Sequence, residues 1–393
     1  MTREGIKNKT SKEELIAIRE SINALCKQFP GDYWRVLDEQ NKYPSDFVKA
    51  MTESGFLAVL IPEKYGGAGL GLEAACVILE EIHKNGCNAG ACHAQMYTMG
   101  TILKHGSDRQ KKEWLPKIAS GEIRLQAFGV TEPTSGTDTL SLKTTAIKQG
   151  KDYIINGQKI WTSRAEYSDY MVLLARTTPQ DKVEKKGQGL SVFMVDMRIA
   201  KKEGMTIRPI KTMMNHSSTE VFFDNVKVSE NNLIGKEGNG FKYILDGMNA
   251  ERTLIAAECL GDAQWFIKKA SSYAKEREVF GSPIGKNQGV QFPIAKAYAS
   301  YRAADLIVKE AAIKFDNNEK CAEEANIGKM LAADASWEAA EACVQTFGGF
   351  AFAEEYDIER KFRETRLYQV APISTNLILA YISQNVLGLP KSY

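Results

Sequence analysis

The segment DYIINGQKIWTS, residues 152–163, decides the fold because it fits neither of the helical patterns on its two sides. Its β-branched and aromatic residues form a short run that is typical of strands. Asn156 and Gly157 lie in the middle, and this pair strongly favours a two-residue hairpin because both residues tolerate positive φ. The segment therefore predicts two short strands joined by a tight turn at Asn156 and Gly157.

Further β-rich segments follow, and helical patterns lie outside them. The β-rich segments are DYMVLLA at 169–175, GLSVFMVDM at 189–197, GMTIRPI at 204–210 and EVFFDNVKV at 220–228. Before about residue 123 and after residue 240, apolar residues recur at three- and four-residue intervals, which predicts helices. The long C-terminal helices are expected at 240–276, 288–316, 322–346 and 374–387.

These patterns predict an α+β protein of several domains. We expect an N-terminal all-helical domain over residues 1–127, a small β domain over residues 128–237 and a helical bundle over residues 238–393. A chain of 393 residues is long enough to bury an active site between such domains.

The composition narrows the class of partner and of location. A net charge of +2 gives no reason to expect nucleic acid or a charged membrane surface. No apolar run has the length of a membrane span. The N-terminus, MTREGIKNKTSKEEL, lacks the apolar core of a secretory signal, so we expect a cytoplasmic protein of bacterial type without a signal or transit peptide.

The spacing of cysteine and histidine argues against metal chemistry. The seven cysteines form no Cys-x-x-Cys pair, which favours reduced thiols that act as small core residues. The four histidines have no ligand spacing, and His216 is interpreted as a turn histidine without a catalytic role. No Gly-x-Gly-x-x-Gly follows a strand, which disfavours a nicotinamide-binding sheet.

Four segments occur in the order typical of one family. They are FGVTEPTSGTD at 128–138, NGQKIWTS at 156–163, AERTLIAAECLGDAQWFIKKASSYAKEREVFGSPIGKNQGVQ at 250–291 and QTFGGFAFAEEYDIERKFRE at 345–364. Together they resemble the acyl-CoA dehydrogenases, from about residue 49 to residue 366. The resemblance implies a β-barrel-like middle domain, a C-terminal four-helix domain, FAD as cofactor and α,β-dehydrogenation of an acyl-CoA. It also implies electron-transferring flavoprotein as acceptor and a homo-oligomer, usually a homotetramer.

The resemblance also implies two sets of cofactor-binding residues. The flavin of the same chain would contact Phe128, Val130, Thr131, Gly136, Thr137, Trp161 and Ser163. The adenine and pyrophosphate of a neighbouring subunit's FAD would contact Arg277, Phe280, Gln288, Gln345, Gly348 and Gly349. Small hydroxyls and backbone N–H groups suit flavin acceptors, an indole can stack on the ring, and a guanidinium fork suits a diphosphate. Taken alone, segment 128–138 fits an ordinary strand-to-turn sequence equally well, and Trp161 and Arg277 fit a core residue and a solvated helix end better.

The catalytic base is missing from its most common place. Removal of an α-proton needs a base close to Cα, and most members of the family supply a glutamate from a Y-E-G-T segment. Alignment of 363-RETRLYQVAPISTNL-377 without gaps places Pro372 there, and no Asp or Glu follows Glu364. Isovaleryl-CoA and long-chain types carry the glutamate before an arginine on the helix that begins the C-terminal domain. By this resemblance the base is Glu251 in NAERTLIAA.

Helical periodicity supports this assignment independently. At about 100° per residue, the apolar residues fall on one side of the helix, and Glu251 lies about 60° from Met248 at the edge of that stripe. The stripe consists of Phe241, Ile244, Leu245, Met248, Ile255 and Cys259. Burial there would raise the pKa of the carboxyl towards working pH. Arg252 is expected beside the base or on the CoA side.

The substrate contacts are expected at Thr137, Asn249, Arg252 and Ile373. Proline has no N–H to polarise a thioester oxygen, so Ile373 is the candidate donor next to Pro372. The pocket floor is expected near residues 92–99, and the position of the base favours branched, cyclic or medium-to-long acyl groups. The alternatives are an acyl-CoA oxidase, a monooxygenase or a desulfinase-like lyase of the same fold, or a non-catalytic binding protein.

Overall fold

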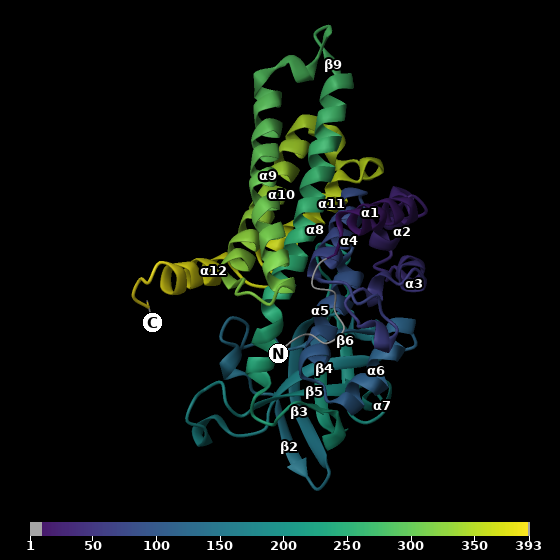
Figure 1. The fold of residues 1–393 in the computed structure, drawn as a ribbon. Helices are drawn as coiled ribbons and strands as arrows, with labels where there is room; N and C mark the ends of the chain where they lie inside the picture. The colour runs from purple at the N-terminus through teal and green to yellow at the C-terminus, as the bar shows by residue number, and fades with distance from the viewer. Residues whose placement is uncertain (1–9, 392–393) are drawn as a thin grey trace.

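A computed structural model describes residues 10–391 in three parts along the chain (Figure 1). The first part is helical: α1 (Lys12–Cys26), α2 (Gly31–Glu39), α3 (Ser45–Glu53), α4 (Leu72–Lys84), α5 (Gly90–His105) and α6 (Asp108–Ser120). Local sequence sets its helix ends. At the start of α6 the Ser107 hydroxyl accepts from the N–H of Gln110, and the Gln110 side chain accepts from the N–H of Ser107. The helix ends at Gly121, which has a φ of +80°.

The middle part is a mixed β-sheet, drawn in teal at the foot of Figure 1. Its elements are β1 (Leu125–Gly129), β2 (Thr145–Gln149), β3 (Asp152–Ser163), β4 (Tyr170–Arg176), β5 (Leu190–Asp196), α7 (Met197–Ala200), β6 (Met205–Pro209), β7 (Ser218–Ser229) and β8 (Leu233–Ile234). The strand order is β6-β7-β3-β2-β4-β5-β8, and β1 pairs with β4 in parallel. The predicted boundary after residue 127 therefore lies inside β1.

The predicted hairpin at Asn156 and Gly157 is wrong. β3 runs straight through both residues, and the turn between β2 and β3 lies earlier, at Gly150 with φ +63°. The Asn156 Oδ1 accepts from the N–H of Asn225 on β7 at 2.8 Å, so the amide side chain is used between strands. Gly157 is required because a Cβ there would lie 2.5 Å from the Thr144 Oγ1. Contacts between strands, rather than a turn, therefore explain why Asn and Gly occur at these two positions.

The third part is a bundle of long helices with short segments at its ends. It comprises α8 (Gly240–Glu276), β9 (Glu278–Val279), β10 (Ser282–Pro283), α9 (Gln288–Asp316), α10 (Ala322–Phe347), α11 (Ile358–Thr365) and α12 (Thr375–Tyr381). The predicted helix at 374–387 is split, because α12 passes into a π-helical turn at Ile382–Val386. No helix within residues 10–391 combines the length and apolar character of a membrane span.

α8 joins the first part to the bundle. Leu254 and Ala257 belong to the same hydrophobic cluster as buried residues of α4, whereas Ile255 and Cys259 pack with α10. Gly261 allows the close approach of α4, because a Cβ there would lie 2.3 Å from the Glu80 carbonyl oxygen. The helix therefore has two buried faces, and its residues are fixed from both sides.

We expect Gly261→Ala to lower the free energy of unfolding by about 1–3 kcal/mol, because the new methyl group overlaps the backbone of α4. Gly247→Ala is the matched control on the same helix. A Cβ there meets nothing within 4 Å, and alanine favours the helix by up to about 1 kcal/mol. Urea unfolding midpoints of the two variants and the parent measure the difference. Equal midpoints for both variants would contradict this packing.

Candidate active site

Glu251 lies on α8 with its carboxyl buried. Glu251 is only 7% exposed, and its side chain forms no hydrogen bond or ion pair with any of residues 10–391. Burial raises the pKa of the Glu251 carboxyl above its usual range, although His93 and Arg252 oppose that shift. The helical periodicity was wrong for Leu245, which is 48% exposed and lines a cavity.

A cavity of about 1000 Å³ lies beside this part of α8. Its apolar wall includes Met96, Tyr97, Leu254 and Phe315, and lysines and carboxylates alternate around the rest. Volume and lining suit a long ligand with a polar end. α5 and α8 therefore form two walls of one ligand-sized space.

The four predicted substrate residues are not all brought together. Asn249 lines the large cavity, and the Arg252 Nη1 donates to the Asn249 Oδ1 at 3.1 Å. Arg252, Thr137 and Ile373 are not among the residues that line it, and neither is Glu251. The predicted pocket floor at 92–99 contributes Met96 and Tyr97.

The segment that contains Pro372 is held by a buried cation that the sequence did not reveal. The Lys329 Nζ donates to the carbonyl oxygens of Tyr368 at 2.7 Å and Ile373 at 3.1 Å. Burial lowers the pKa of Lys329, so these carbonyls are its compensation. The backbone on both sides of Pro372 is thereby fixed relative to α10.

A buried ion pair joins the two predicted flavin motifs. The Lys159 Nζ donates to the Glu132 Oε1 at 2.8 Å and to the Val130 carbonyl at 3.0 Å. The same carboxylate accepts from the N–H groups of Lys143 and Thr144. Burial lowers the pKa of Lys159 to about 8 while Glu132 opposes the shift. The sequence could have indicated this ion pair, because Glu132 and Lys159 carry opposite charges and each lies in one of the two motifs.

The ion pair between Lys159 and Glu132 lies beside an open surface at one end of the sheet. Trp161 is 56% exposed at φ +59°, and a Cβ at Gly136 would meet nothing within 4 Å. Phe128 and Val130 are half-buried behind them, as are Thr131 and Ser163, while Thr137 is exposed. An exposed indole beside open backbone and hydroxyls fits a large planar cofactor with polar edges.

The second predicted cofactor set lies at the opposite end of the long helices (Figure 1). Its members are Arg277, Phe280, Gln288, Gln345, Gly348 and Gly349, all exposed. Phe280 is fully exposed at φ +53°, and added Cβ atoms at the two glycines would meet nothing. The structure thus does not bring the two sets together within one chain.

Sequence reasoning missed a polar cluster behind Glu251. Glu258 accepts from the Tyr368 hydroxyl at 3.0 Å and pairs with the His93 Nδ1 at 3.1 Å. Burial alone would raise the pKa of Glu258, but His93, His83 and Tyr368 hold it at about 2. The residues come from four separate helical segments, so no local pattern could have indicated them.

Three family models match consecutive parts of the chain. They describe the N-terminal, middle and C-terminal domains of acyl-CoA dehydrogenases and match residues 12–122, 127–226 and 238–386.

Relatives and solved structures match over nearly the whole length. An acyl-CoA dehydrogenase of Bacillus subtilis (strain 168) is 32% identical over 381 residues, covering 96% of this chain and 98% of that protein. A glutaryl-CoA dehydrogenase of Desulfococcus multivorans is 33% identical, covering 95% and 96%. The structure of a glutaryl-CoA dehydrogenase with glutaryl-CoA has a TM-score of 0.89 at 30% identity, covering 98% and 97%. The chain therefore belongs to the acyl-CoA dehydrogenase family of flavoprotein oxidoreductases, whose cofactor is FAD.

Proposed function

We propose that this protein oxidises an acyl-CoA thioester between Cα and Cβ to the 2-enoyl-CoA, with Glu251 removing the α-proton. The observation that carries the proposal is a buried carboxyl without a partner, on the helix that lines the large cavity. FAD, held at the surface around Trp161, supplies the acceptor for the hydride from Cβ. Glu251 would take up the α-proton, and bound FAD would accept the hydride.

The other buried carboxylates of α8 are poorer candidates for the base. Glu258 has a pKa held at about 2 by its partners, and Asp262 is paired with Lys361 at 2.6 Å. A base with so low a pKa takes a proton weakly, whereas a raised pKa suits proton transfer near neutral pH. Glu251 alone among the three combines burial with freedom from partners in the described chain.

We infer that Arg252 and Ile373 orient the thioester. Arg252 is tied to Asn249 on the cavity wall, so its charge is fixed near the base. Because Pro372 has no N–H, the N–H of Ile373 is the nearest backbone donor in that segment, and Lys329 fixes its carbonyl. Thr137 is assigned to the CoA side of the cofactor.

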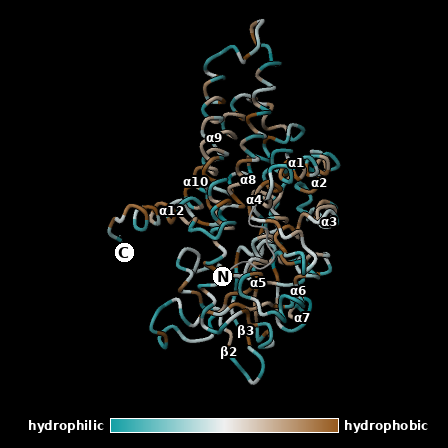
Figure 2. The backbone as a smooth tube through the Cα atoms, viewed as in Figure 1, coloured by the Kyte–Doolittle hydropathy of each residue, from teal (hydrophilic) through white to brown (hydrophobic). Residues whose placement is uncertain are grey.

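We also infer a homo-oligomer, a tetramer, and electron-transferring flavoprotein as acceptor. The distant set around Arg277 would complete a neighbour's FAD site, which explains why a fully exposed Phe280 is kept there. α12 extends away from the bundle and carries hydrophobic colour in Figure 2; Leu379 on α12 and Leu387, after the π-helical turn, are exposed. An exposed Trp161 leaves the edge of the cofactor surface open to a redox partner.

Glu251→Gln is expected to retain FAD and fold while losing turnover by about 100- to 10,000-fold, because the amide cannot take the α-proton. Flavin absorbance measures retention, and anaerobic bleaching by a panel of acyl-CoA thioesters measures the reaction. Glu276→Gln, at the exposed end of the same helix, is the matched control and should keep parental rates. Full turnover by Glu251→Gln would sink the assignment.

The raised pKa of Glu251 also predicts a pH dependence of stability. A raised folded pKa contributes stability below the ordinary glutamate pKa of about 4.3, and that stability is lost as pH rises through the folded value. The stability of Glu251→Gln relative to the parent should therefore increase from about pH 4 towards neutrality.

Glu258→Gln provides the opposite control for that titration. Its lowered pKa contributes stability above the ordinary glutamate value, and that stability is lost as pH falls towards about 2. Its relative stability should therefore decrease as pH rises from about 3 to neutrality. Thermal midpoints of the parent and both variants across this range test the signs, and parallel curves for the two variants would be inconsistent with the proposed difference.

The assembly is tested by Arg277→Ala combined with Phe280→Ala. If a neighbour's cofactor is held there, FAD should bind about 10-fold or more weakly, because a charge-assisted contact is removed. Flavin content after gel filtration measures the loss, and Lys275→Ala, two residues before Arg277 and exposed, is the control. The shared site would be excluded if the parent protein were monomeric and the double variant retained as much FAD as the parent.

A further inference from the structure

His93 is a buried histidine that uses only one of its two ring nitrogens. It lies on α5 and is 6% exposed. Its Nδ1 lies 3.1 Å from the Glu258 Oε1. Its Nε2 is buried and forms no hydrogen bond with any of residues 10–391. A buried nitrogen without a partner is costly, so packing alone does not explain this ring.

The contact with Glu258 decides where His93 carries a proton. Burial opposes the ionisation of Glu258, but His93, His83 and Tyr368 together hold its pKa at about 2. Glu258 is therefore ionised at neutral pH, and an ionised carboxylate at 3.1 Å requires a proton on the Nδ1. Any further proton that the ring gains or loses is at Nε2.

His83, the second histidine beside Glu258, shows the contrast. Its Nε2 accepts from the N–H of Ala89 at 3.0 Å, and its Nδ1 contacts the Asp262 Oδ1 at 2.8 Å. Both nitrogens of this buried ring are thus used within the chain. Of the two histidines that neighbour Glu258, only His93 has a nitrogen left for another group.

α5 packs against α8, which carries Glu251 and Glu258 on one face. These two carboxylates are seven residues apart, or about 10 Å along the helix. His93 contacts Glu258, and its ring lies 5.0 Å from that of Tyr97, one turn further along α5. Burial, and after it the charge of Glu251, raises the pKa of the Tyr97 hydroxyl. The two helices therefore run antiparallel here, and Glu251 lies in the direction of Tyr97 from the His93 ring.

Titratable groups from three helices surround Glu251. His93 and Tyr97 belong to α5, Arg252 follows Glu251 on α8, and Tyr381 of α12 acts on Arg252. Burial raises the pKa of Glu251, and His93 opposes this shift more strongly than Arg252 does. His93 is therefore the main positive influence on Glu251 from outside its own helix.

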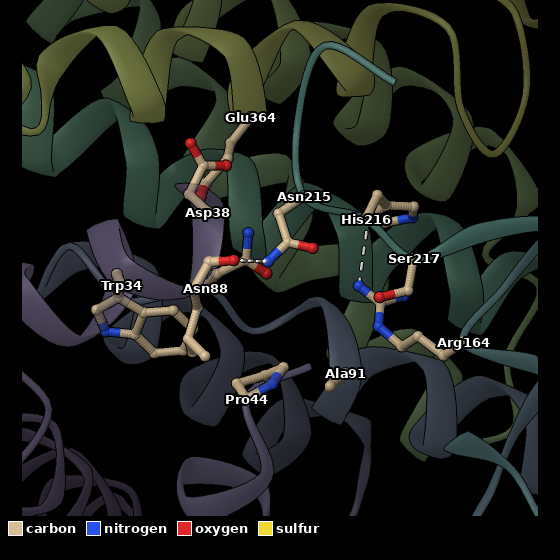
Figure 3. Close-up of a pocket in the computed structure, with 11 residues that line it drawn as sticks. Trp34, Asp38, Pro44, Asn88, Ala91, Arg164, Asn215, His216, Ser217 and Glu364 are labelled. Atoms are coloured by element: carbon tan, nitrogen blue, oxygen red, sulfur yellow. Dashed lines mark hydrogen bonds between the residues drawn. The ribbon is translucent and has the colours of Figure 1, made fainter. Parts of the chain in front are cut away.

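Two more titratable groups near His93 come from the middle part of the chain. Arg164 follows β3 and is 5% exposed, and its Nη2 donates to the His216 Nδ1 at 3.3 Å (Figure 3). Burial lowers the pKa of His216 to about 3, so its ring is neutral at neutral pH. Arg164 disfavours a second cation nearby, so the protonated form of His93 depends on Glu251 and Glu258 of α8.

We propose that His93 is the positioning residue that keeps Glu251 ionised: Glu258 fixes its Nδ1, and a proton on its Nε2 supplies positive charge near the proposed base. This rests on the proposed role of Glu251 in the dehydrogenation. An opposite charge favours the ionised form of a buried carboxyl, and only the ionised form can take the α-proton. The two groups that stand without partners in the described chain, the Glu251 carboxyl and the His93 Nε2, are thereby explained together.

His93→Gln tests this charge through the pH dependence of kcat/KM. The acid limb of that profile reports the ionisation of the base in the free enzyme. Without the imidazolium the limb should move up by about one pH unit or more, while the plateau above it stays close to the parental value. A defect of packing alone would lower the rate at every pH and leave the limb in place, and that result would overturn the proposal.

Two further substitutions on α5 separate charge from shape. His93→Lys restores a cation near Glu258 in a side chain of different shape, so its acid limb should lie near the parental position. Thr98→Val removes a fully buried hydroxyl from the same helix without changing any charge, and its limb should not move. An acid limb for His93→Lys that matches the limb for His93→Gln would contradict the role of charge.

The same coupling can be measured without turnover and without any change at His93. Histidine labelled with carbon-13 at Cε1 gives at most four ring signals, because the chain has four histidines. By linkage, Glu251→Gln should lower the pKa of His93 by about as much as His93→Gln raises that of the base. An unchanged His93 pKa in Glu251→Gln would overturn the proposal even if His93→Gln does not fold.

A failure of the proposed function would look different. If no thioester bleached the parent flavin, the role of Glu251 as the base would be overturned. The ring signals would still decide whether His93 and Glu251 are coupled, so the two failures are distinguishable.

Discussion

The buried carboxylates of α8 are the constraint on which the rest of the structure depends. Glu251, Glu258 and Asp262 project from one helix into the interior, where an ionised carboxylate is costly unless donors or cations compensate it. Asp262 is compensated by Lys361 at 2.6 Å and Glu258 by His93 at 3.1 Å. Of these three, only Glu251 has no compensating partner among residues 10–391, so local environment separates two structural carboxylates from a proposed base on the same helix.

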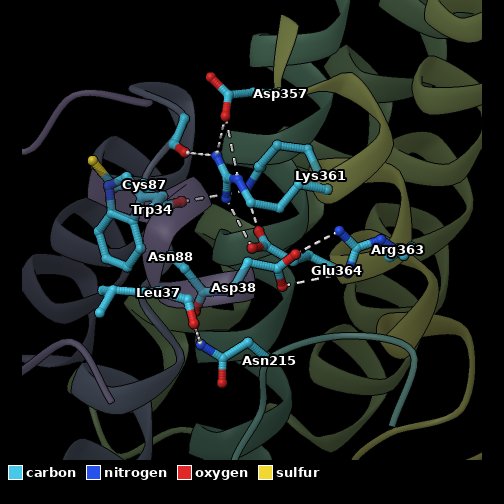
Figure 4. Close-up of polar contacts among 12 residues, drawn as sticks. Trp34, Leu37, Asp38, Cys87, Asn88, Asn215, Asp357, Lys361, Arg363 and Glu364 are labelled. Carbon is cyan, nitrogen blue, oxygen red and sulfur yellow. Dashed lines mark hydrogen bonds and ion pairs between the residues drawn. The ribbon is translucent and has the colours of Figure 1, made fainter. Parts of the chain in front are cut away.

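The same ion pairs fix the parts of the molecule relative to one another. Asp262 on α8 contacts His83 on α4 at 2.8 Å and Lys361 on α11 at 2.6 Å, so one carboxylate links three helices. Arg363, also on α11, pairs with Asp38 on α2 and donates to the carbonyl of Met213 in the middle part at 2.9 Å (Figure 4). Each of these contacts has a fixed geometry, so the walls of the cavity beside α8 are held from several directions.

The sequence predicted what local periodicity controls. The three-part order, the long helices and the buried edge of α8 that carries Glu251 follow from apolar spacing. The sequence wrongly predicted a hairpin turn at Asn156 and Gly157, because contacts with β7 and Thr144 override their local preference for a turn. Arg164 was missed because an arginine after a strand is usually solvated, and its isolation exists only once distant segments surround it.

Glu251 and Arg164 are buried charges of opposite sign, and the fold prevents them from neutralising each other. Glu251 lies on α8 and Arg164 follows β3, and neither side chain forms an ion pair within residues 10–391. Each charge costs stability in the absence of a ligand, and stability is what selection readily exchanges for function at such sites.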